Sequence, residues 1–239
     1  MHFQAHARAG RWQEAARHLG AFASSITEID PSDLTEVSGN LIPAAAAIVR
    51  SGRSDDYEAF RRLLVRRFSA TRHVAVAEQV MKSCLLTPAA PGTLAGLEPL
   101  EGLVKESCAQ PGPPADAYMH AWRCFCLGLL EYRRVNYEQA LPWLDRALAT
   151  PNTNDAREAA TRMARAMAFI QLGHRDRADI EARRADALLE IHQGTATSPT
   201  PPEYAAEGFH GYWFDWVINQ ILRDELRRTG QVDSASPAP

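Results

Sequence analysis

The side chains best suited to metal chemistry in this sequence are four cysteines and an N-terminal pair of histidines. Cys124 and Cys126 are two residues apart on an expected helix, so they point about 200° apart and cannot hold one metal ion together. His2 and His6 can share a helix face, but the glutamate of a His-Glu-x-x-His motif and a third ligand are missing. We therefore expect no bound metal or cofactor. The cysteines are too few and too scattered for a disulfide framework, so we expect buried, reduced thiols at Cys84, Cys108, Cys124 and Cys126.

His174, Arg175 and Asp176 form the residue order of the catalytic loop of protein kinases. In that loop an asparagine five residues after the aspartate holds a metal ion, and Glu181 stands in its place here. The sequence also lacks a glycine-rich phosphate loop, Val-Ala-Ile-Lys, Asp-Phe-Gly and a Gly-x-Ser-x-Gly elbow. We therefore expect the triplet to be a coincidence in a hairpin turn, and the chain not to be an enzyme. A Ser/His/Asp triad assembled only by the fold stays open.

Arg61, Arg62, Arg66 and Arg67 are expected on the exposed face of one helix, where they could contact phosphate groups. The chain has a net charge of -3 and a pI of about 6.2, which gives no general attraction for nucleic acid or anionic membranes. No aromatic platform is interleaved with the arginines, and a charged helix face is usually solvated. We expect neither a nucleic-acid nor a membrane partner. The sequence contains no run of eighteen apolar residues and no signal peptide, which favours a cytoplasmic location.

Residues 122–151 carry the strongest structural pattern. Gly128 and Ala140 are small residues placed where two antiparallel helices would approach each other, and Leu144, Ala147 and Pro151 follow in the second helix. The segment resembles a tetratricopeptide repeat. That resemblance implies a helical hairpin that stacks on its neighbours, and it implies a fold rather than a reaction.

Weaker copies of this hairpin predict an all-α fold: an α-solenoid of about five tetratricopeptide-like hairpins with a C-terminal capping helix. Val135 lies in the turn of the 122–151 hairpin, and Gly10 and Gly173 take its place in two of the weaker copies. Only nine residues precede Gly10, so Met1 is expected inside a helix and the first hairpin is expected to be truncated. The chain would then be the C-terminal part of a longer protein. The alanines equated with Ala140 are Ala15, Ala59 and Ala178.

The chain is expected to consist of two halves and a tail. Residues 1–110 are predicted to form the N-terminal hairpins, and residues 111–230 the tetratricopeptide-like hairpins with the aromatic capping helix. A proline-rich break at 110–114 separates the halves, although both have the same helical pattern. Residues 231–239 are expected to be a disordered tail. A proline-rich linker at 198–202 precedes the capping helix, which carries Phe209, Tyr212, Trp213, Trp216, Ile221 and Leu222.

The expected functional surface is a groove lined by the first helices of successive hairpins. Methionine and aromatic side chains there suit an amphipathic helix or an extended peptide from a protein partner. The alternative is that the same side chains pack on a neighbouring helix or on the aromatic cap at Trp213 and Trp216. The candidate groove residues are Trp122, Phe125, Leu129, Tyr132, Met163, Met167 and Ile170.

Three stretches together resemble the C-terminal helical region of bacterial eukaryote-like serine/threonine kinases. They are Ala77-Glu78 with Cys84-Leu85-Leu86-x-Pro88, the Gly128 to Ala140 hairpin, and Trp213-Phe214-Asp215-Trp216 with Ile221-Leu222-Arg223-x-Glu225. The resemblance implies a region that mediates protein contacts beside a kinase domain. Since no kinase motif is present, the kinase activity does not carry over.

These observations lead to one functional hypothesis and two alternatives. We expect a non-enzymatic scaffold or regulatory module for protein–protein interaction, associated with a serine/threonine kinase system. The first alternative is a helical domain that senses a small molecule or catalyses a reaction in a pocket of the superhelix. The second is a nucleic-acid adaptor that uses the arginine cluster, and its binding would weaken steeply with salt.

Overall fold

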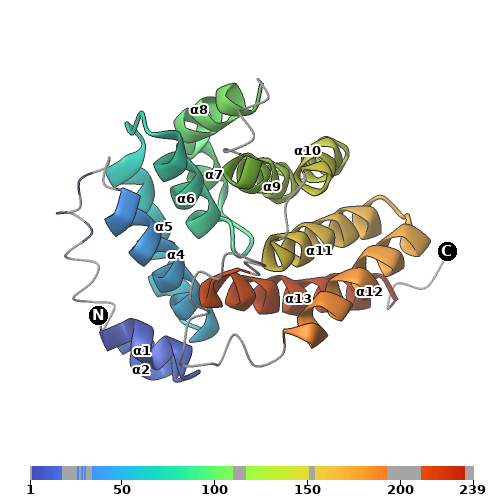
Figure 1. Cartoon of the computed structure of the whole chain (residues 1–239), viewed down its shortest axis with the longest axis horizontal. Helices are drawn as coiled ribbons and strands as arrows, with labels where there is room; N and C mark the ends of the chain where they lie inside the picture. Colours follow the sequence, from blue (N-terminus) through green and yellow to red (C-terminus); the bar gives the residue numbers. More distant parts are fainter. Residues whose placement is uncertain are drawn as a thin grey trace.

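The computed structural model describes residues 2–17, 34–109, 117–150, 154–192 and 211–234, together with Ile26, Glu28 and Asp30. These residues form twelve helices and no strand (Figure 1). The prediction of an all-α fold is therefore confirmed. The predicted break at 110–114 and the predicted linker at 198–202 both lie outside the described ranges.

Two prolines of the first half lie within helices. Pro43 lies inside one continuous helix that begins at Leu34. Pro99 lies in the first turn of a helix that begins at Glu98, because the ring of a proline is incompatible with an α-helix that continues from the preceding turn, and Leu94 belongs to a separate short helix before it. The helices are α1 (His2–Arg8), α2 (Trp12–Arg17), α4 (Leu34–Arg50), α5 (Ser54–Phe68), α6 (Val74–Cys84), α7 (Pro91–Gly96) and α8 (Glu98–Ala109).

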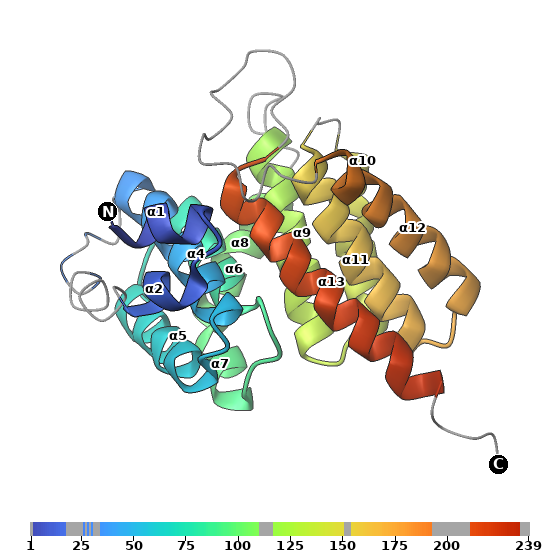
Figure 2. The ribbon, with the colours of Figure 1, turned by 90° about the horizontal axis from the view of Figure 1, so that it is seen from below.

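The second half contains two antiparallel hairpins and one long helix. The hairpins are α9 (Ala117–Arg133) with α10 (Tyr137–Ala149), and α11 (Asp155–Gln171) with α12 (Arg175–Ile191). The long helix α13 (Trp213–Ser234) crosses from α4 along α11 (Figures 1 and 2). Residues 231–234 are therefore helical, and the prediction of a disordered tail is wrong for them. Residues 235–239 lie outside the described part of the chain.

Three hairpin turns share one backbone conformation. Gly10, Val135 and Gly173 have φ angles of 69°, 66° and 76°. In each turn the following N–H donates to the carbonyl oxygen five residues earlier, at 2.9, 2.9 and 2.8 Å. This hydrogen bond belongs to the Schellman motif, which ends a helix with a residue in the left-handed region. The predicted equivalence of these three turn residues is confirmed.

The predicted alignment of the α4–α5 hairpin with the α9–α10 hairpin is shifted by two residues. Ala59 was equated with Ala140, but Ala59 is exposed while Ala140 is fully buried. Gly52 has a φ of 74° and is the turn residue here, so Tyr57 falls at the buried position that Ala140 occupies in its own hairpin. The tyrosine is large where the other hairpins have alanine. This hairpin therefore differs from the tetratricopeptide pattern at a core position.

The α9–α10 hairpin has the close helix approach that its small residues predict. A Cβ atom added at Gly128 would lie 2.6 Å from the Leu144 side chain and 3.2 Å from the carbonyl oxygen of Ala140. Such distances are well below van der Waals contact, so only glycine fits at this crossing. Gly128 and Ala140 thus set the spacing of the two helices.

One hydrophobic core runs through both halves. It includes side chains from Ala7 in α1 to Leu222 in α13, on both sides of the 110–114 break. α6 contacts α9, and α13 contacts both α4 and α11. The two predicted halves are therefore packed against each other over a shared core.

Val135→Gly is expected to stabilise the protein. Val135 is 65% exposed, so its side chain adds little packing, whereas a β-branched residue at this φ is strained. We expect the free energy of unfolding in urea to rise by about 0.5–1 kcal/mol. The matched control is Gly173→Val, which should lower it by about 1–2 kcal/mol. If both variants unfolded at the wild-type urea concentration, the strain argument would be wrong.

Candidate functional site

The residues predicted to line a binding groove are all buried. Their exposed fractions lie between 0% and 8%, so none of the seven presents an open surface. Trp122 packs beneath the Lys82 ammonium group of α6, with Nζ 3.9 Å from the ring centroid. Tyr132 faces Glu225 and Thr229 of α13, and Ile170 packs with Leu226 of the same helix. The groove geometry must therefore be corrected, because neighbouring helices cover these residues.

α13 covers much of this surface with an apolar face. Figure 2 shows the helix running diagonally across the molecule, with one end beside α4 and the other along α11 and α12. The helix was predicted to cap the last hairpin; it does pack along α11 of that hairpin, and it also contacts α4 in the first half. We call the surface that it covers on α4, α9 and α11 the α13 interface. The apolar α13 side chains buried there are Trp213, Trp216, Val217, Ile218, Ile221 and Leu222.

A buried ion pair holds the middle of α13. The side chain of Arg133, at the end of α9, is 1% exposed and forms a bidentate pair with Glu225. Its Nη2 donates to Glu225 Oε2 at 2.8 Å. The same guanidinium donates to the carbonyl oxygens of Leu85 at 3.0 Å and Leu86 at 3.2 Å. Arg133 therefore joins α9, the segment after α6 and α13 in one network.

Two half-buried ion pairs also hold α13 in place. Arg50 of α4 lies 3.0 Å from Asp224, and Arg223 lies 2.8 Å from Asp186 of α12. Pairs at the solvent boundary contribute less stability than buried pairs, but they favour one orientation of the helix.

The start of α13 is fixed by a capping arrangement. The N–H of Tyr212 donates to Asp215 Oδ2 at 3.0 Å, while Tyr212 O accepts from the N–H of Asp215. Gly211 has a φ of 114°, and a Cβ atom there would lie 2.5 Å from Cβ of Ala156 in α11. One turn after Asp215, the Asn219 side-chain amide donates to Ala156 O at 2.8 Å.

Asp215 belongs to a buried charged cluster between α6, α9 and α13. Lys82 Nζ lies 2.9 Å from Glu78, and all three side chains are 0–3% exposed. Burial raises the pKa of Asp215 to about 6; Glu78 adds to the rise, while Lys82 and the Tyr212 amide oppose it. These groups are packed into the core, and Glu78 and Lys82 already pair with each other.

The four cysteines are free and buried, as predicted, but the structure adds a cluster that sequence spacing did not reveal. Cys124 and Cys126 do point to different surroundings. Cys126 Sγ lies 3.8 Å from Glu78 O, whereas Cys124 Sγ lies 3.5 Å from His120 Nε2. Cys108 of α8 completes a group with His120 and Cys124. The i, i+4 spacing of His120 and Cys124 was a usable signal that the sequence analysis missed.

The arginine cluster of α5 does not form one exposed face. Arg61 is fully buried, with its guanidinium over the Tyr57 ring and Nη1 donating to Pro88 O at 3.0 Å. It also donates to the carbonyl and hydroxyl of Thr87. Arg62 and Arg66 are exposed, and Arg67 is half-buried. The exposed-face prediction is therefore wrong for Arg61, which serves the core.

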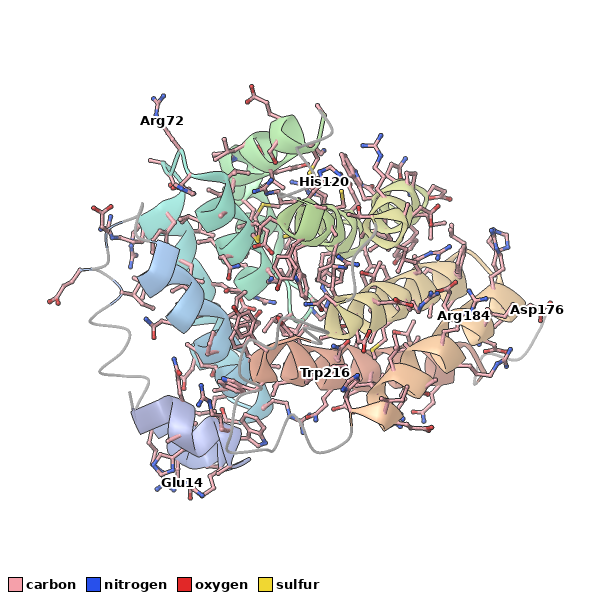
Figure 3. The ribbon with its side chains drawn as sticks, viewed as in Figure 1. Glu14, Arg72, His120, Asp176, Arg184 and Trp216 are labelled. Carbon is pink, nitrogen blue, oxygen red and sulfur yellow. The ribbon has the colours of Figure 1, made fainter. Side chains whose placement is uncertain are left out.

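The other residues considered for catalysis lie apart. His174, Arg175 and Asp176 are exposed at the turn between α11 and α12, and Asp176 lies at the outer edge of the molecule (Figure 3). His6 Nδ1 accepts a hydrogen bond from Arg11 Nε at 3.2 Å, and the His2 side chain is outside the described part.

The sequence and structure were compared with protein-family models, curated proteins and solved structures. None matched. The resemblances to tetratricopeptide repeats and to kinase C-terminal regions therefore depend on residues of this chain alone. Every described helix is too short or too polar to span a membrane.

Arg133→Met is expected to destabilise the protein by about 3–5 kcal/mol, because it leaves Glu225 charged and unpaired in a buried position. Adding Glu225→Leu should recover part of this loss, so that the double variant is more stable than the sum of the single effects predicts. The matched control is Arg134→Met, which breaks the partly exposed pair with Glu101 and should cost about 1 kcal/mol. Urea unfolding gives the free energy of unfolding of the three single variants, Arg133→Met, Glu225→Leu and Arg134→Met, and of the double variant. Strictly additive effects of Arg133→Met and Glu225→Leu would argue against the buried pair.

Asp215 should make the protein less stable as the pH rises from about 4 to about 6. Its folded pKa of about 6 lies above the unfolded value, so the folded state binds the proton more tightly. The stabilisation present at pH 4 is lost through this window and amounts to about 3 kcal/mol. Asp215→Asn, which can still accept from Tyr212, should remove the loss in urea titrations at several pH values. Asp224→Asn on the same helix is the control, and an unchanged slope in Asp215→Asn would refute this account.

Proposed function

We propose that this chain is a non-enzymatic protein-interaction module whose hairpins bind an amphipathic helix, with α13 as the resident intramolecular occupant. The observation that carries the proposal is the seating of α13. Its buried residues recur at helical spacing, as in Trp213, Val217 and Ile221, and they pack on α4 and α11. Helix recognition in a groove uses anchors with this spacing. A partner helix would take the place of α13.

The polar contacts of α13 define the chemistry of such a partner. A competing helix needs large apolar side chains to replace Trp216 and Leu222, and a carboxylate at the position of Glu225 to satisfy Arg133. Without that carboxylate the Arg133 guanidinium would lose its counter-charge in the core, which is costly. We therefore propose a protein or peptide partner with an acidic amphipathic helix.

The setting we propose is a bacterial serine/threonine kinase system in the cytoplasm. Its support is that the residues carrying the resemblance meet beneath α13. Glu78 of α6 and Asp215 of α13 belong to the same buried cluster, and the Gly128–Ala140 hairpin supports Arg133. In this proposal the chain regulates protein contacts of the kinase and performs no phosphoryl transfer.

The alternative of a small-molecule or enzymatic pocket would need accessible polar side chains. The buried charged cluster of Glu78, Lys82 and Asp215 offers suitable groups, but they are 0–3% exposed and engaged by core contacts. This arrangement favours the interaction module.

The proposal predicts that a helix with the α13 sequence binds in trans when the resident helix cannot dock. In the full chain, Leu222→Asp places a charge at a fully buried position of α13 and should release the helix. A fluorescent peptide of residues 211–234 should then bind this variant saturably, with an affinity at least about tenfold higher than for wild type. Fluorescence anisotropy measures the binding, and circular dichroism shows that the hairpins remain folded.

Two controls make this experiment decisive. Arg227→Asp changes an exposed α13 residue and should bind the peptide as weakly as wild type does. A peptide carrying Glu225→Lys should bind the released variant much more weakly, because it meets Arg133 with a like charge. If the released variant stays helical but does not bind the peptide, the α13 interface is a permanent part of the core and the proposed function fails.

A further inference from the structure

Cys108, His120 and Cys124 meet at the junction of α8 and α9. Cys108 lies in the last turn of α8, while His120 and Cys124 are four residues apart on α9 and share a face. Two Sγ atoms and one imidazole nitrogen lie within 4.8 Å of one another. Figure 3 shows His120 beside α8, far from Trp216 on α13. This cluster is therefore separate from the α13 interface.

The spacing of the cluster suits a tetrahedral metal ion. Zn–S bonds of about 2.3 Å and Zn–N bonds of about 2.0 Å at the tetrahedral angle place sulfur and nitrogen about 3.5 Å apart. The distance from Cys124 Sγ to His120 Nε2 is 3.5 Å. The same geometry requires two sulfurs about 3.8 Å apart, which is inside the 4.8 Å limit that the cluster satisfies. The distance between Cys124 and His120 thus matches a zinc site, and Cys108 Sγ lies within 4.8 Å of both ligand atoms.

Zinc binds cysteine as the thiolate, so both thiols of the cluster must lose their protons when the ion binds. The hydrogen bond between the two thiols lowers the pKa of Cys108 and raises that of Cys124, and burial also raises the pKa of Cys124. The guanidinium groups of Arg123 and Arg146 favour the thiolate at both positions. Two thiolates next to these cations would neutralise a bound Zn²⁺.

Cys126 provides an internal comparison. It lies two residues from Cys124 on the same helix, but its Sγ faces the carbonyl of Glu78 and not the imidazole of His120. His120 is half-buried, whereas both thiols of the cluster are 0–4% exposed. Solvent therefore reaches the imidazole side of the cluster and can supply both an entry path and a further ligand.

We propose that Cys108 Sγ, Cys124 Sγ and His120 Nε2 bind one zinc ion, with a solvent molecule as the fourth ligand. Two thiolates and an imidazole select zinc over the hard cations magnesium and calcium. Binding displaces one proton from each thiol into solvent, and no oxidant or reductant is needed. The ion joins the end of α8 to the beginning of α9, so it ties together the two halves of the chain.

The test uses the full, tag-free chain, reduced and stripped of metal. Zinc should bind at one ion per chain, and zinc at about one hundred times its dissociation constant should raise the melting temperature by about 5–10 °C. Cys108→Ser, Cys124→Ser and His120→Ala should each weaken zinc binding at least about 100-fold. Cys126→Ala and Cys84→Ala are matched controls and should bind zinc as wild type does. Mass spectrometry of the metal content and competition with a chromophoric chelator measure these outcomes.

A spectroscopic measurement on the wild-type chain removes the dependence on variants that fold poorly. Cobalt(II) in place of zinc should give thiolate-to-metal charge-transfer absorption and the intense visible bands of a tetrahedral site. Absence of these bands together with no stoichiometric zinc would overturn the proposal. So would zinc binding that is unchanged in Cys108→Ser and Cys124→Ser. A Cys108–Cys124 disulfide in the isolated protein, with no zinc bound after reduction, would also overturn it and make the cluster a redox pair.

Discussion

The end of a helix that is buried from water must find donors for its last carbonyl groups, and the C-terminal end of α6 places this demand at the centre of the molecule. Cys84, Leu85 and Leu86 are fully buried. Tyr57 Oη donates to Ser83 O at 2.8 Å, Arg133 donates to Leu85 O and Leu86 O, and Arg61 serves the two residues that follow. Donors from α5 and α9 thus converge on one segment. Because Arg133 also pairs with Glu225, the position of α13 follows from the capping of α6.

Hairpins were predictable from this sequence because their determinants are local. A small residue at Gly128 and a left-handed turn at Gly10 or Gly173 act within one hairpin, so spacing alone indicates them. Arg61 and Arg133 were not identified as core residues, since a charged side chain on a helix is usually exposed. The carbonyl groups and the Glu225 carboxylate that these two arginines bind in the core lie 26 to 92 residues away in sequence. Periodicity contains no information about contacts at such separations.

The candidate sites show the same division between local pattern and tertiary contact. Helical spacing correctly placed Trp122 and Met167 on apolar faces, but it could not show which neighbouring helix covers them. The cover is provided partly by α13. A proline-rich stretch separates α13 from the hairpins in the sequence, so helical spacing does not indicate where α13 docks on them. Likewise, His120 and Cys124 share a face by spacing, whereas the approach of Cys108 depends on how α8 packs on α9.

α13 is held by an interface that combines strong and weak parts. Burial of Trp216 or Leu222 contributes about 1.5–3 kcal/mol each. Against this, Asp215 is charged in a buried position above pH 6, and Asn219 Oδ1 has no hydrogen-bond partner among the described residues. Apolar residues of similar size at these two positions would bind the helix more tightly. The polar groups instead favour one register of α13 at the cost of affinity, and the function proposed above, in which a partner helix displaces α13, depends on this combination.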